Sequence, residues 1–531
     1  MNPLAQIRVP GGPRWAYVFG SALLALLLAQ LASGLALGFN YSASLPAAWA
    51  SVARIEQTPL GHLFRGLHAQ GATFLLVVAT LHLLQTAMAG AFREQRAATW
   101  WLGLALLALL FAFCLSGSLL PWDERGYWAT RVTAGIIDSA PLAGPALSRL
   151  ILGGREFGNL TLARFYAVHA TLLPLLLVLL GTLHVAAVRR HGVQPLRAGP
   201  EQSFWPGQAL LDATFAVLVL AALLAAAVKL GAPLTAPADP SGAANPRPEW
   251  YFRPLFELLK LMPIGLEAFG TFFVPLLAAA FLVAMPYVRS QKAALGVLLA
   301  GMAGSIALCA ASYREDAASS DFARQEALSR GRAQKALKLA RSVGVPPEGA
   351  LALLNNQPDE RGGRLFARVC TDCHAEGRKA PRLDGLFSRD FIRAALAHPE
   401  QVYATAKLTG MEGYQKLGEQ KLNQLVEYLY ALRSRPADDP ALESGRRAFT
   451  AAGCGDCHAL SQGGPARGPS LVGYGSPAWL RGLLQDPGTP LYYDAQNRMP
   501  DFGNRLAPED IDDLVAYLIS LENPSQEGPN P

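Results

Sequence analysis

Residues 68–82 read HAQGATFLLVVATLH, an apolar run with a histidine at each end. Residues 169–184 repeat this arrangement as HATLLPLLLVLLGTLH. Both runs lie within longer stretches, 66–92 and 165–188, that lack Lys, Arg, Asp and Glu and are long enough to cross a bilayer as helices. Because polar residues inside membrane spans are costly, these four histidines are the first candidates for a functional role.

The charge distribution divides the chain into two unlike parts. Residues 1–312 hold 20 Lys/Arg and 12 Asp/Glu, whereas residues 313–531 hold 26 and 28, so net charges of +8 and −2 give the total of +6. Charged residues make up 16% of the chain, against about 25% in ordinary soluble domains. This composition excludes a disordered chain and predicts a membrane body followed by a water-soluble tail.

Seven transmembrane helices are predicted in the membrane body. Besides the two histidine-bearing stretches, the charge-free runs are Trp15–Ala53, Ala97–Trp122, Ala213–Val228, Ala268–Val288 and Ala293–Tyr313. The run Ala213–Val228 is short for a span, but Lys229 can extend its ammonium group to the interface.

The positive residues predict the orientation of this body. They precede helix one and follow helices two, four and six, at Arg8, Arg14, Arg93, Arg96, Arg189, Arg190, Arg197, Arg289 and Lys292. The positive-inside rule places these segments and the N-terminus in the cytoplasm, and helix seven then leads the tail to the outside.

The four histidines are predicted to form two pairs. His68 and His82 are 14 residues apart and His169 and His184 are 15 apart, which is about 21–22 Å along each helix. Because both helices run inward, His68 lies level with His169 and His82 with His184. A lone histidine in a span is more often a packing residue, but two pairs at matching depths favour two bis-histidine hemes b.

Glycines repeat the same spacing on two other helices. Gly20 and Gly34 are 14 residues apart, as are Gly103 and Gly117. A macrocycle between helices requires close backbone approach, which glycine permits, although small residues also serve ordinary helix packing. The agreement with the histidine spacing favours contact with heme. Cys114 and Cys309, in contrast, are expected to be small buried residues.

Three ordered motifs give the membrane body a resemblance to the cytochrome b subunit of cytochrome bc complexes. They are Leu120–Trp128 (LPWDERGYW), Thr161–Tyr166 (TLARFY) and Pro248–Tyr251 (PEWY). The unequal histidine spacing is similar to that of the plastid branch, in which the last three helices form a separate subunit. Val18 stands where that branch has the cysteine that attaches an extra heme.

The resemblance also implies roles for single residues. Arg65 and Arg164 are expected to pair with the propionates of the outer heme, since guanidinium groups match carboxylates. Glu249 is the expected proton acceptor for quinol oxidation at an outer site, and Tyr251 is expected to shape that site. Asp212 is the candidate for an inner quinone site, although an acid at a helix end is nearly as plausible.

A repeat built on Cys-x-x-Cys-His occupies the tail. Its copies are Cys370–His374 (CTDCH) and Cys454–His458 (CGDCH). In c-type cytochromes the two cysteines, here Cys370 with Cys373 and Cys454 with Cys457, attach the heme and the histidine binds iron. Zinc sites and thioredoxin-like pairs also use Cys-x-x-Cys, but a histidine follows directly in both copies and favours heme c.

One methionine follows each motif, and the tail has no others. A methionine thioether is a soft sixth ligand for heme iron, so we predict one His/Met set in each repeat, His374 with Met411 and His458 with Met499.

Both repeats resemble small class I cytochrome c domains, whose corresponding proline carbonyl, here of Pro381 and Pro469, orients the histidine. The sequence thus predicts a mainly α fold in five parts. These are a four-helix heme-binding region (1–200), a three-helix region with the quinol motif (201–312), a connector (313–358) and two cytochrome c domains (359–435 and 440–523).

Together, these resemblances imply a tetraheme subunit of a quinol:cytochrome c oxidoreductase that works by a proton-translocating Q-cycle. The acceptor would be a soluble cytochrome c or a terminal oxidase, and the quinol would come from the membrane pool. Because the tail cysteines are already used, the family's Rieske iron–sulfur centre is expected on a separate subunit. We also expect a homodimer in a bacterial-type inner membrane, periplasmic C-terminal domains and no nucleic-acid partner.

Two other functions fit part of the pattern. A heme b anchor of a dehydrogenase or reductase needs the histidines but not the PEWY motif. A module that relays electrons to an oxidase could carry a diheme tail, but the sequence contains no histidine cluster of a copper site.

Overall fold

The computed structural model describes residues 8–522 except 139, 141–142, 196–198, 243–246, 264–265, 267–268, 375–379, 381–382, 384, 403–410, 412, 415–416, 461–467, 490 and 493–498. The chain forms two compact units, Met1–Leu351 and Ala352–Pro531. The division between the units falls within the predicted connector, 313–358.

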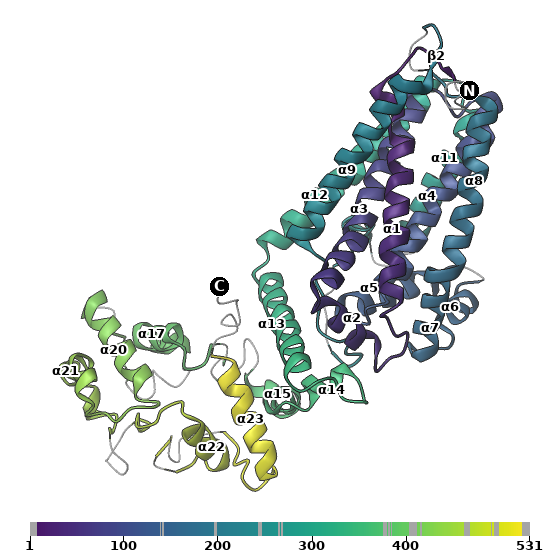
Figure 1. Ribbon diagram of the computed structural model, residues 1–531. Helices are drawn as coiled ribbons and strands as arrows, with labels where there is room; N and C mark the ends of the chain where they lie inside the picture. Colours follow the sequence, from purple (N-terminus) through teal and green to yellow (C-terminus); the bar gives the residue numbers. More distant parts are fainter. Residues whose placement is uncertain are drawn as a thin grey trace. The chain divides into compact units, whose positions relative to one another are not determined.

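Long apolar helices dominate the first unit (Figure 1). They are α1 (Phe19–Gly38), α3 (Pro59–Met88), α4 (Ala97–Ser118), α8 (Leu173–His191), α9 (Ala209–Leu230) and α12 (Gln291–Ala318). The helix α7 (Asn159–Ala167) and a π-helical turn (Val168–Leu172) continue directly into α8. Six helices within the described residues are long and apolar enough to cross a membrane, so the protein is a multi-pass membrane protein.

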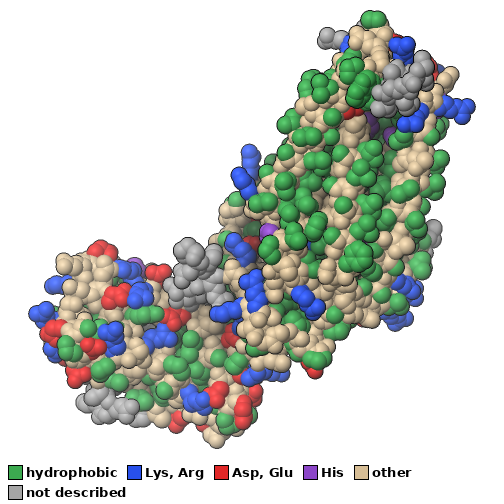
Figure 2. Space-filling model, in the orientation of Figure 1, with side chains coloured by type: hydrophobic (Ala, Val, Ile, Leu, Met, Phe, Trp, Pro, Cys, Tyr) green, Lys and Arg blue, Asp and Glu red, His purple; other side chains and the backbone are tan. Residues whose placement is uncertain are grey.

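The remaining predicted span is shorter than the others. The helix α11 (Val274–Ala284) continues through a 3₁₀ turn to Tyr287 and is preceded by a π-helical turn (Phe269–Phe273). On the visible face of the long helices, hydrophobic side chains cover the middle and charged ones gather toward the two ends (Figure 2). This distribution is typical of a surface that faces lipid.

The first charge-free stretch divides into two helices. The span α1 ends at Gly38, and α2 (Ala48–Glu56) is a separate amphipathic helix. Its Trp49 is buried, and the indole donates a hydrogen bond to the carbonyl of Thr235, 2.9 Å away. The charge-free stretch Trp15–Ala53 therefore extends past the end of the membrane span and includes the first part of α2.

The later helices α9 and α11 pack against the helices α1, α3 and α4 of the N-terminal part. Trp100 and Trp101 of α4 donate indole hydrogen bonds to the carbonyls of Leu282 and Val283 in α11, at 2.8 and 2.9 Å. The helix α10 (Arg253–Lys260) lies against α12. The smaller elements of this unit are β1 (Arg8–Val9), β2 (Gln202–Ser203), α5 (Glu124–Asp138) and α6 (Gly144–Leu152).

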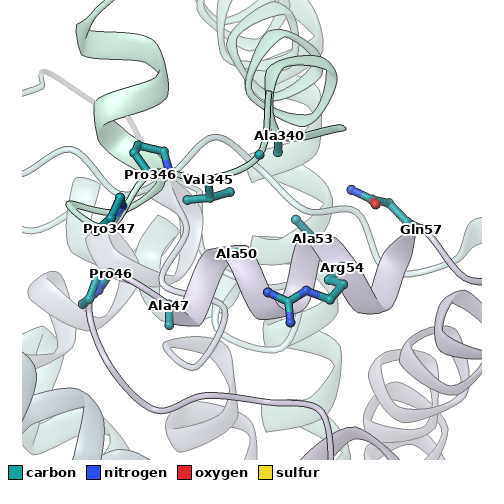
Figure 3. A pocket seen from close by; sticks show the side chains of 11 residues that line it. Pro46, Ala47, Ala50, Ala53, Arg54, Gln57, Ala340, Val345, Pro346 and Pro347 are labelled. Carbon is teal, nitrogen blue, oxygen red and sulfur yellow. The ribbon is translucent and has the colours of Figure 1, made fainter. Parts of the chain in front are cut away.

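A helix of the predicted connector lies on the first unit. This helix, α13 (Ser320–Ser342), lies against α2 and ends before Pro346 and Pro347, since proline cannot continue a helix. Ser329 of α13 donates a hydrogen bond to Glu124, 3.1 Å away. Ala340 and Val345–Pro347 line a hollow over α2 that Arg54 borders (Figure 3).

Short helices make up the second unit. They are α15 (Pro358–Val369), α16 (Thr371–His374), α17 (Arg389–Ala397), α18 (Pro399–Val402), α20 (Glu419–Ala431), α21 (Glu443–Ala451), α22 (Pro477–Gln485) and α23 (Pro508–Ser520), and α14 (Ala350–Asn355) precedes them. The first helix of the first repeat, α15, packs on the last helix of the second, α23, while α20 packs on α21. The repeats therefore share their packing, whereas the sequence predicts that each folds on itself.

Candidate heme and quinol sites

The outer histidines face one another between α3 and the π-helical turn before α8. The ring centroids of His68 and His169 are 6.1 Å apart, with an angle of 73° between the ring planes. The two predicted glycines lie directly beside these rings. A Cβ on Gly34 would lie 3.1 Å from Cε1 of His68, and a Cβ on Gly117 would lie 2.7 Å from Cε1 of His169.

Two serines that the sequence analysis missed orient the outer rings. The Oγ of Ser33 lies 3.1 Å from Nδ1 of His68, and the Oγ of Ser116 lies 3.0 Å from Nδ1 of His169. Each hydroxyl donates to the carbonyl four residues earlier, so it can accept a hydrogen bond from the imidazole. Both serines directly precede a predicted glycine, and this repeated Ser-Gly pair was the signal available in the sequence.

The inner histidines also lie beside their two predicted glycines, but their hydrogen bonds differ from those of the outer pair. A Cβ on Gly103 would lie 3.3 Å from Cε1 of His184, and one on Gly20 would lie 4.0 Å from Cε1 of His82. The Nδ1 of His184 donates to the carbonyl of Thr99 at 3.1 Å. The buried Nδ1 of His82 has no hydrogen-bond partner in the described part of the chain.

These residues fit two hemes held by pairs of imidazoles. In three of the four rings Nδ1 is hydrogen-bonded, which leaves Nε2 for a metal. The separation of 6.1 Å between the rings of His68 and His169 accommodates one metal ion between two imidazole nitrogens at about 2 Å from each, the usual metal–imidazole length. At Gly34, Gly117 and Gly103 a Cβ would crowd a histidine ring, whereas at Gly20 it would make an ordinary contact.

The two arginines predicted near the outer heme have protein partners in this structure. Arg65 is buried and forms an ion pair with Glu56. Arg164 donates a hydrogen bond to the carbonyl of Leu150. Their pairing with heme propionates remains a prediction.

The PEWY motif lies against the C-terminal half of α4. The hydroxyl of Tyr251 forms a hydrogen bond with Cys114, and its ring centroid is 6.3 Å from that of Phe111. Burial raises the pKa of Tyr251, with Cys114 and Glu249 adding to the effect, so the phenol stays protonated and can donate a hydrogen bond. Cys114 is one helical turn from Gly117, which faces His169.

Glu249 is accessible beside this contact. Its Oε1 lies 3.8 Å from an Nη1 of Arg125, and about 45% of its side chain is exposed. Arg125 belongs to the LPWDERGYW motif, whose Trp122 and Tyr127 cluster with Leu162 of the TLARFY motif, so the structure connects all three sequence motifs. At 3.8 Å this ion pair holds the carboxylate loosely, so the exposed side chain of Glu249 can move.

An ion-pair cluster that the sequence analysis missed anchors the motif. Arg247 and Arg253 flank PEWY, and both contact the buried carboxylate of Asp316 at the end of α12, at 2.7 and 2.6 Å. The guanidinium of Arg253 also lies 4.0 Å from the ring centroid of Tyr313. These residues are far apart in sequence, and no local pattern indicates the contact.

Asp212 is hydrogen-bonded at the start of α9. It accepts from Ser21 at 2.6 Å and from Gln208 at 2.7 Å. Ser21 directly follows Gly20, which faces His82. Asp212 therefore lies at the same end of the bundle as the inner histidine pair.

Both Cys-x-x-Cys-His motifs form a similar turn. The amide of His374 donates to the carbonyl of Cys370 at 3.0 Å, and that of His458 donates to Cys454 at 2.9 Å. The Nδ1 of His458 donates to the carbonyl of Pro469 at 3.0 Å, as expected, whereas Pro381 lies outside the described residues. None of the four cysteines forms a disulfide, and a Cβ on Gly468 would lie 2.7 Å from the ring of His458. These residues fit covalently attached heme.

Comparison with known proteins identifies both parts. Residues 5–192 match the family model described as "Cytochrome b/b6/petB". A cytochrome b6 from Synechococcus sp. (strain JA-3-3Ab) is 36% identical over 178 residues, which cover 33% of this chain and 83% of that protein. The chain belongs to the cytochrome b/b6 family. The cytochrome b6 of Cyanidium caldarium is 34% identical over the same length and with the same coverage.

The tail matches a second family. Residues 357–429 and 440–518 each match the model described as "Cytochrome C oxidase, cbb3-type, subunit III". A chain of a solved "Hyperthermophilic respiratory Complex III" has a TM-score of 0.51 and 24% identity, covering 58% of this chain and 86% of its own length. At that identity the likeness shows the fold alone.

These matches confirm the predicted fold class and the resemblance to a b6-like cytochrome b fused to cytochrome c domains. Heme b and heme c are the cofactors that the two families imply, and the protein has an oxidoreductase role in a bc-type complex.

Proposed function

We propose that this protein is the cytochrome b and cytochrome c core of a quinol:cytochrome c oxidoreductase. The supporting observation is the position of Glu249, which is half exposed and belongs to the PEWY motif. Tyr251 of this motif is hydrogen-bonded to Cys114, one helical turn from Gly117, and Gly117 lies beside His169 of the outer histidine pair. Bound hemes would supply one-electron carriers across the membrane body and in the tail. The residues of the chain would bind quinol and quinone and move the protons.

At the outer site, Tyr251 and Glu249 have complementary roles. The protonated phenol of Tyr251 is held by Cys114 and can donate a hydrogen bond to a quinone oxygen. Glu249 can accept a proton from quinol and release it to the exposed side, because its side chain is half exposed and its ion pair with Arg125, at 3.8 Å, is loose.

At the opposite end, Asp212 is the proposed proton donor to an inner quinone. Its two oxygens are already oriented by Ser21 and Gln208. Proton release at one end and proton uptake at the other constitute the proton-translocating step of a Q-cycle.

The further components follow from the same proposal. The chain would carry two hemes b and two hemes c. A Rieske iron–sulfur centre would be supplied by a separate subunit, and a soluble cytochrome c or a terminal oxidase would accept the electrons. The complex would be a homodimer in a bacterial-type inner membrane with the N-terminus in the cytoplasm and the c-type repeats outside.

Substitution of Glu249 by Gln tests this proposal. We expect quinol-dependent reduction of cytochrome c by the purified complex to fall by at least about a hundredfold, the lower end of what a general base contributes. Glu156→Gln is the matched control, because Glu156 is 82% exposed and only 3.7 Å from Arg131. Full activity of Glu249→Gln would exclude the outer site, and activity in a preparation without an iron–sulfur subunit would exclude the Rieske partner.

A further inference from the structure

The two cytochrome c repeats exchange their first helices. The helix α15 of the first repeat lies on α23 of the second, and α21 of the second lies on α20 of the first (Figure 1). At each crossing a glycine allows contact: a Cβ on Gly362 would collide with the carbonyl of Asp513, and one on Gly445 would collide with Tyr428. The equivalent contacts show that the two crossings are versions of one helix pair.

The exchange extends to the heme-attachment motifs. Cys370 belongs to a buried cluster with Trp479, Phe502 and Leu514 of the second repeat, and Met499 packs against this cluster. Cys454 belongs to a different cluster with residues of the first repeat, which are Ile392, Leu396, Leu422, Leu425, Val426, Tyr428 and Leu432. Each motif therefore lies in the core formed by the other repeat's later helices.

Direct contacts support this assignment on the Met411 side. Tyr414, three residues after Met411, forms a side-chain hydrogen bond with Cys454 and packs on the cluster that contains it. Tyr414, close to Met411 in sequence, is thus joined to the second Cys-x-x-Cys-His motif. This contact would not form if each repeat folded on itself.

The chain changes partners at two equivalent positions. Phe387 precedes α17 and Gly475 precedes α22, and both have left-handed backbones, with φ of 63° and 78°. They also touch, since a Cβ on Gly475 would lie 2.7 Å from Cγ of Phe387. Residues 388–475 then form one core, and the residues before and after them form the other.

One ion pair favours the exchanged pairing over in-repeat pairing. Arg361 donates to both carboxylate oxygens of Asp513, at 2.6 and 2.7 Å, and Asp513 is only 6% exposed. The equivalent positions in the other helix pair are Ser444 and Gln424, as the glycine and tyrosine contacts align them. In-repeat pairing would place Asp513 opposite Ser444 and leave a buried carboxylate without its cation, which is costly.

The connection between the repeats acts in the same direction. Only residues 432–439 separate α20 from the 3₁₀ turn (Pro440–Leu442) that begins α21. The hydroxyl of Tyr428 closes this connection by donating to the carbonyl of Ala437 at 3.1 Å. Short connections favour packing between consecutive helices.

We propose that the axial ligands of the two c-type hemes are exchanged between the repeats. The heme on Cys370, Cys373 and His374 takes Met499, and the heme on Cys454, Cys457 and His458 takes Met411. This inference rests on the proposed attachment of two hemes c. It replaces the prediction of one His/Met set within each repeat. Each heme site instead takes its cysteines and histidine from one repeat and its methionine from the other.

The test removes one heme and then one methionine in the full-length chain. Cys370→Ala with Cys373→Ala leaves the second heme c. In that background Met411→Leu is expected to abolish the sulfur-to-iron charge-transfer band and to lower the heme c potential, since the thioether raises it. Met499→Leu is expected to leave both unchanged. The opposite result would establish in-repeat ligation and overturn the proposal.

A reciprocal charge exchange provides a second measurement if the one-heme background does not accumulate. Arg361→Glu or Asp513→Arg alone is expected to lower the amount of covalent heme per chain and the thermal midpoint, and the double variant is expected to restore both. Additive losses would overturn the exchanged packing. Mass spectrometry of the unmodified chain tests the attachment of hemes c separately from the exchange of their ligands. Fewer than two attached hemes would refute the heme c assignment itself.

Discussion

The side chain of Ser33 holds the imidazole of His68, with Oγ 3.1 Å from Nδ1. Ser116 and His169 repeat the relationship at 3.0 Å, so both histidines of the proposed outer heme b site receive the same support. The inner pair differs, because His184 uses a backbone carbonyl and the Nδ1 of His82 has no partner among the described residues. The two sites therefore differ in the electron density that their ligands can offer a metal.

Substitution of Ser33 by Ala tests this difference. The Nδ1 of His68 would lose its acceptor, which costs about 1–3 kcal/mol for a buried donor and makes the imidazole a weaker electron donor. We expect the reduction potential of the outer heme b to rise while that of the inner heme b stays constant, as measured by redox titration of the optical spectrum.

Ser118→Ala is the control for this experiment. Ser118 donates to the carbonyl of Leu115 at 2.9 Å and is two residues from Ser116 on the same helix. An equal change in both variants would show that the effect comes from the helix and not from the histidine ligand.

Gly117→Ala is predicted to damage the outer site selectively. The added Cβ would lie 2.7 Å from Cε1 of His169, so the ring would have to shift. Overpacking of this kind costs about 1–3 kcal/mol. We expect the amount of heme b per chain to fall toward half, as measured by extraction and quantification.

The control for Gly117→Ala is Gly181→Ala on α8. A Cβ on Gly181 would meet no described atom within 4 Å. Normal heme b content in both variants would contradict the close approach of Gly117 to a ligand ring.

The histidine and glycine positions could be predicted because they follow from local geometry. Spacings of 14 and 15 residues bring side chains to one face of a helix whatever its neighbours are. The partners from other helices could not be predicted in this way. The ion pairs of Asp316 with Arg247 and Arg253 join residues more than 60 apart, and only the packing of α10 on α12 brings them together.

The pairing of the tail helices was also beyond the sequence pattern. Both repeats have the same glycine and tyrosine contacts, so a helix of either repeat fits the partner of the other. The apolar periodicity of the helices is therefore the same whether they pair within a repeat or between the repeats. The short connection between α20 and α21 and the match of Arg361 with Asp513 distinguish the two pairings, and the match is recognised only when the helices are aligned in space.

Asp316→Asn is expected to impair quinol oxidation without removing heme. The carboxylate pairs with Arg247 and Arg253 and is 6% exposed, and breaking a buried ion pair costs about 3–5 kcal/mol. The segment that carries Glu249 lies between these two arginines, so its position would be lost. The expected result is a higher KM for quinol with unchanged heme b spectra.

The neighbouring acid Glu315 provides the control for Asp316→Asn. Glu315 pairs with Lys260 at 2.7 Å, but its side chain is 55% exposed, and exposed ion pairs contribute about 0–1 kcal/mol. We expect Glu315→Gln to behave as the unmodified protein. If Asp316→Asn also kept its KM, the arginine contacts would be irrelevant to the outer site.

Asp212→Asn is expected to act at the inner end alone. The substitution keeps the size of the side chain but removes the charge that accepts hydrogen bonds from Ser21 and Gln208, and it cannot donate a carboxyl proton to quinone. We expect hemes b to be reduced normally by quinol and to be reoxidised more slowly, as measured by stopped-flow spectroscopy. Ser21→Ala, which removes one hydrogen bond of about 1.5–3 kcal/mol to the charged group, should slow reoxidation less than Asp212→Asn. Slower reduction in place of slower reoxidation would move the function of Asp212 away from the inner site.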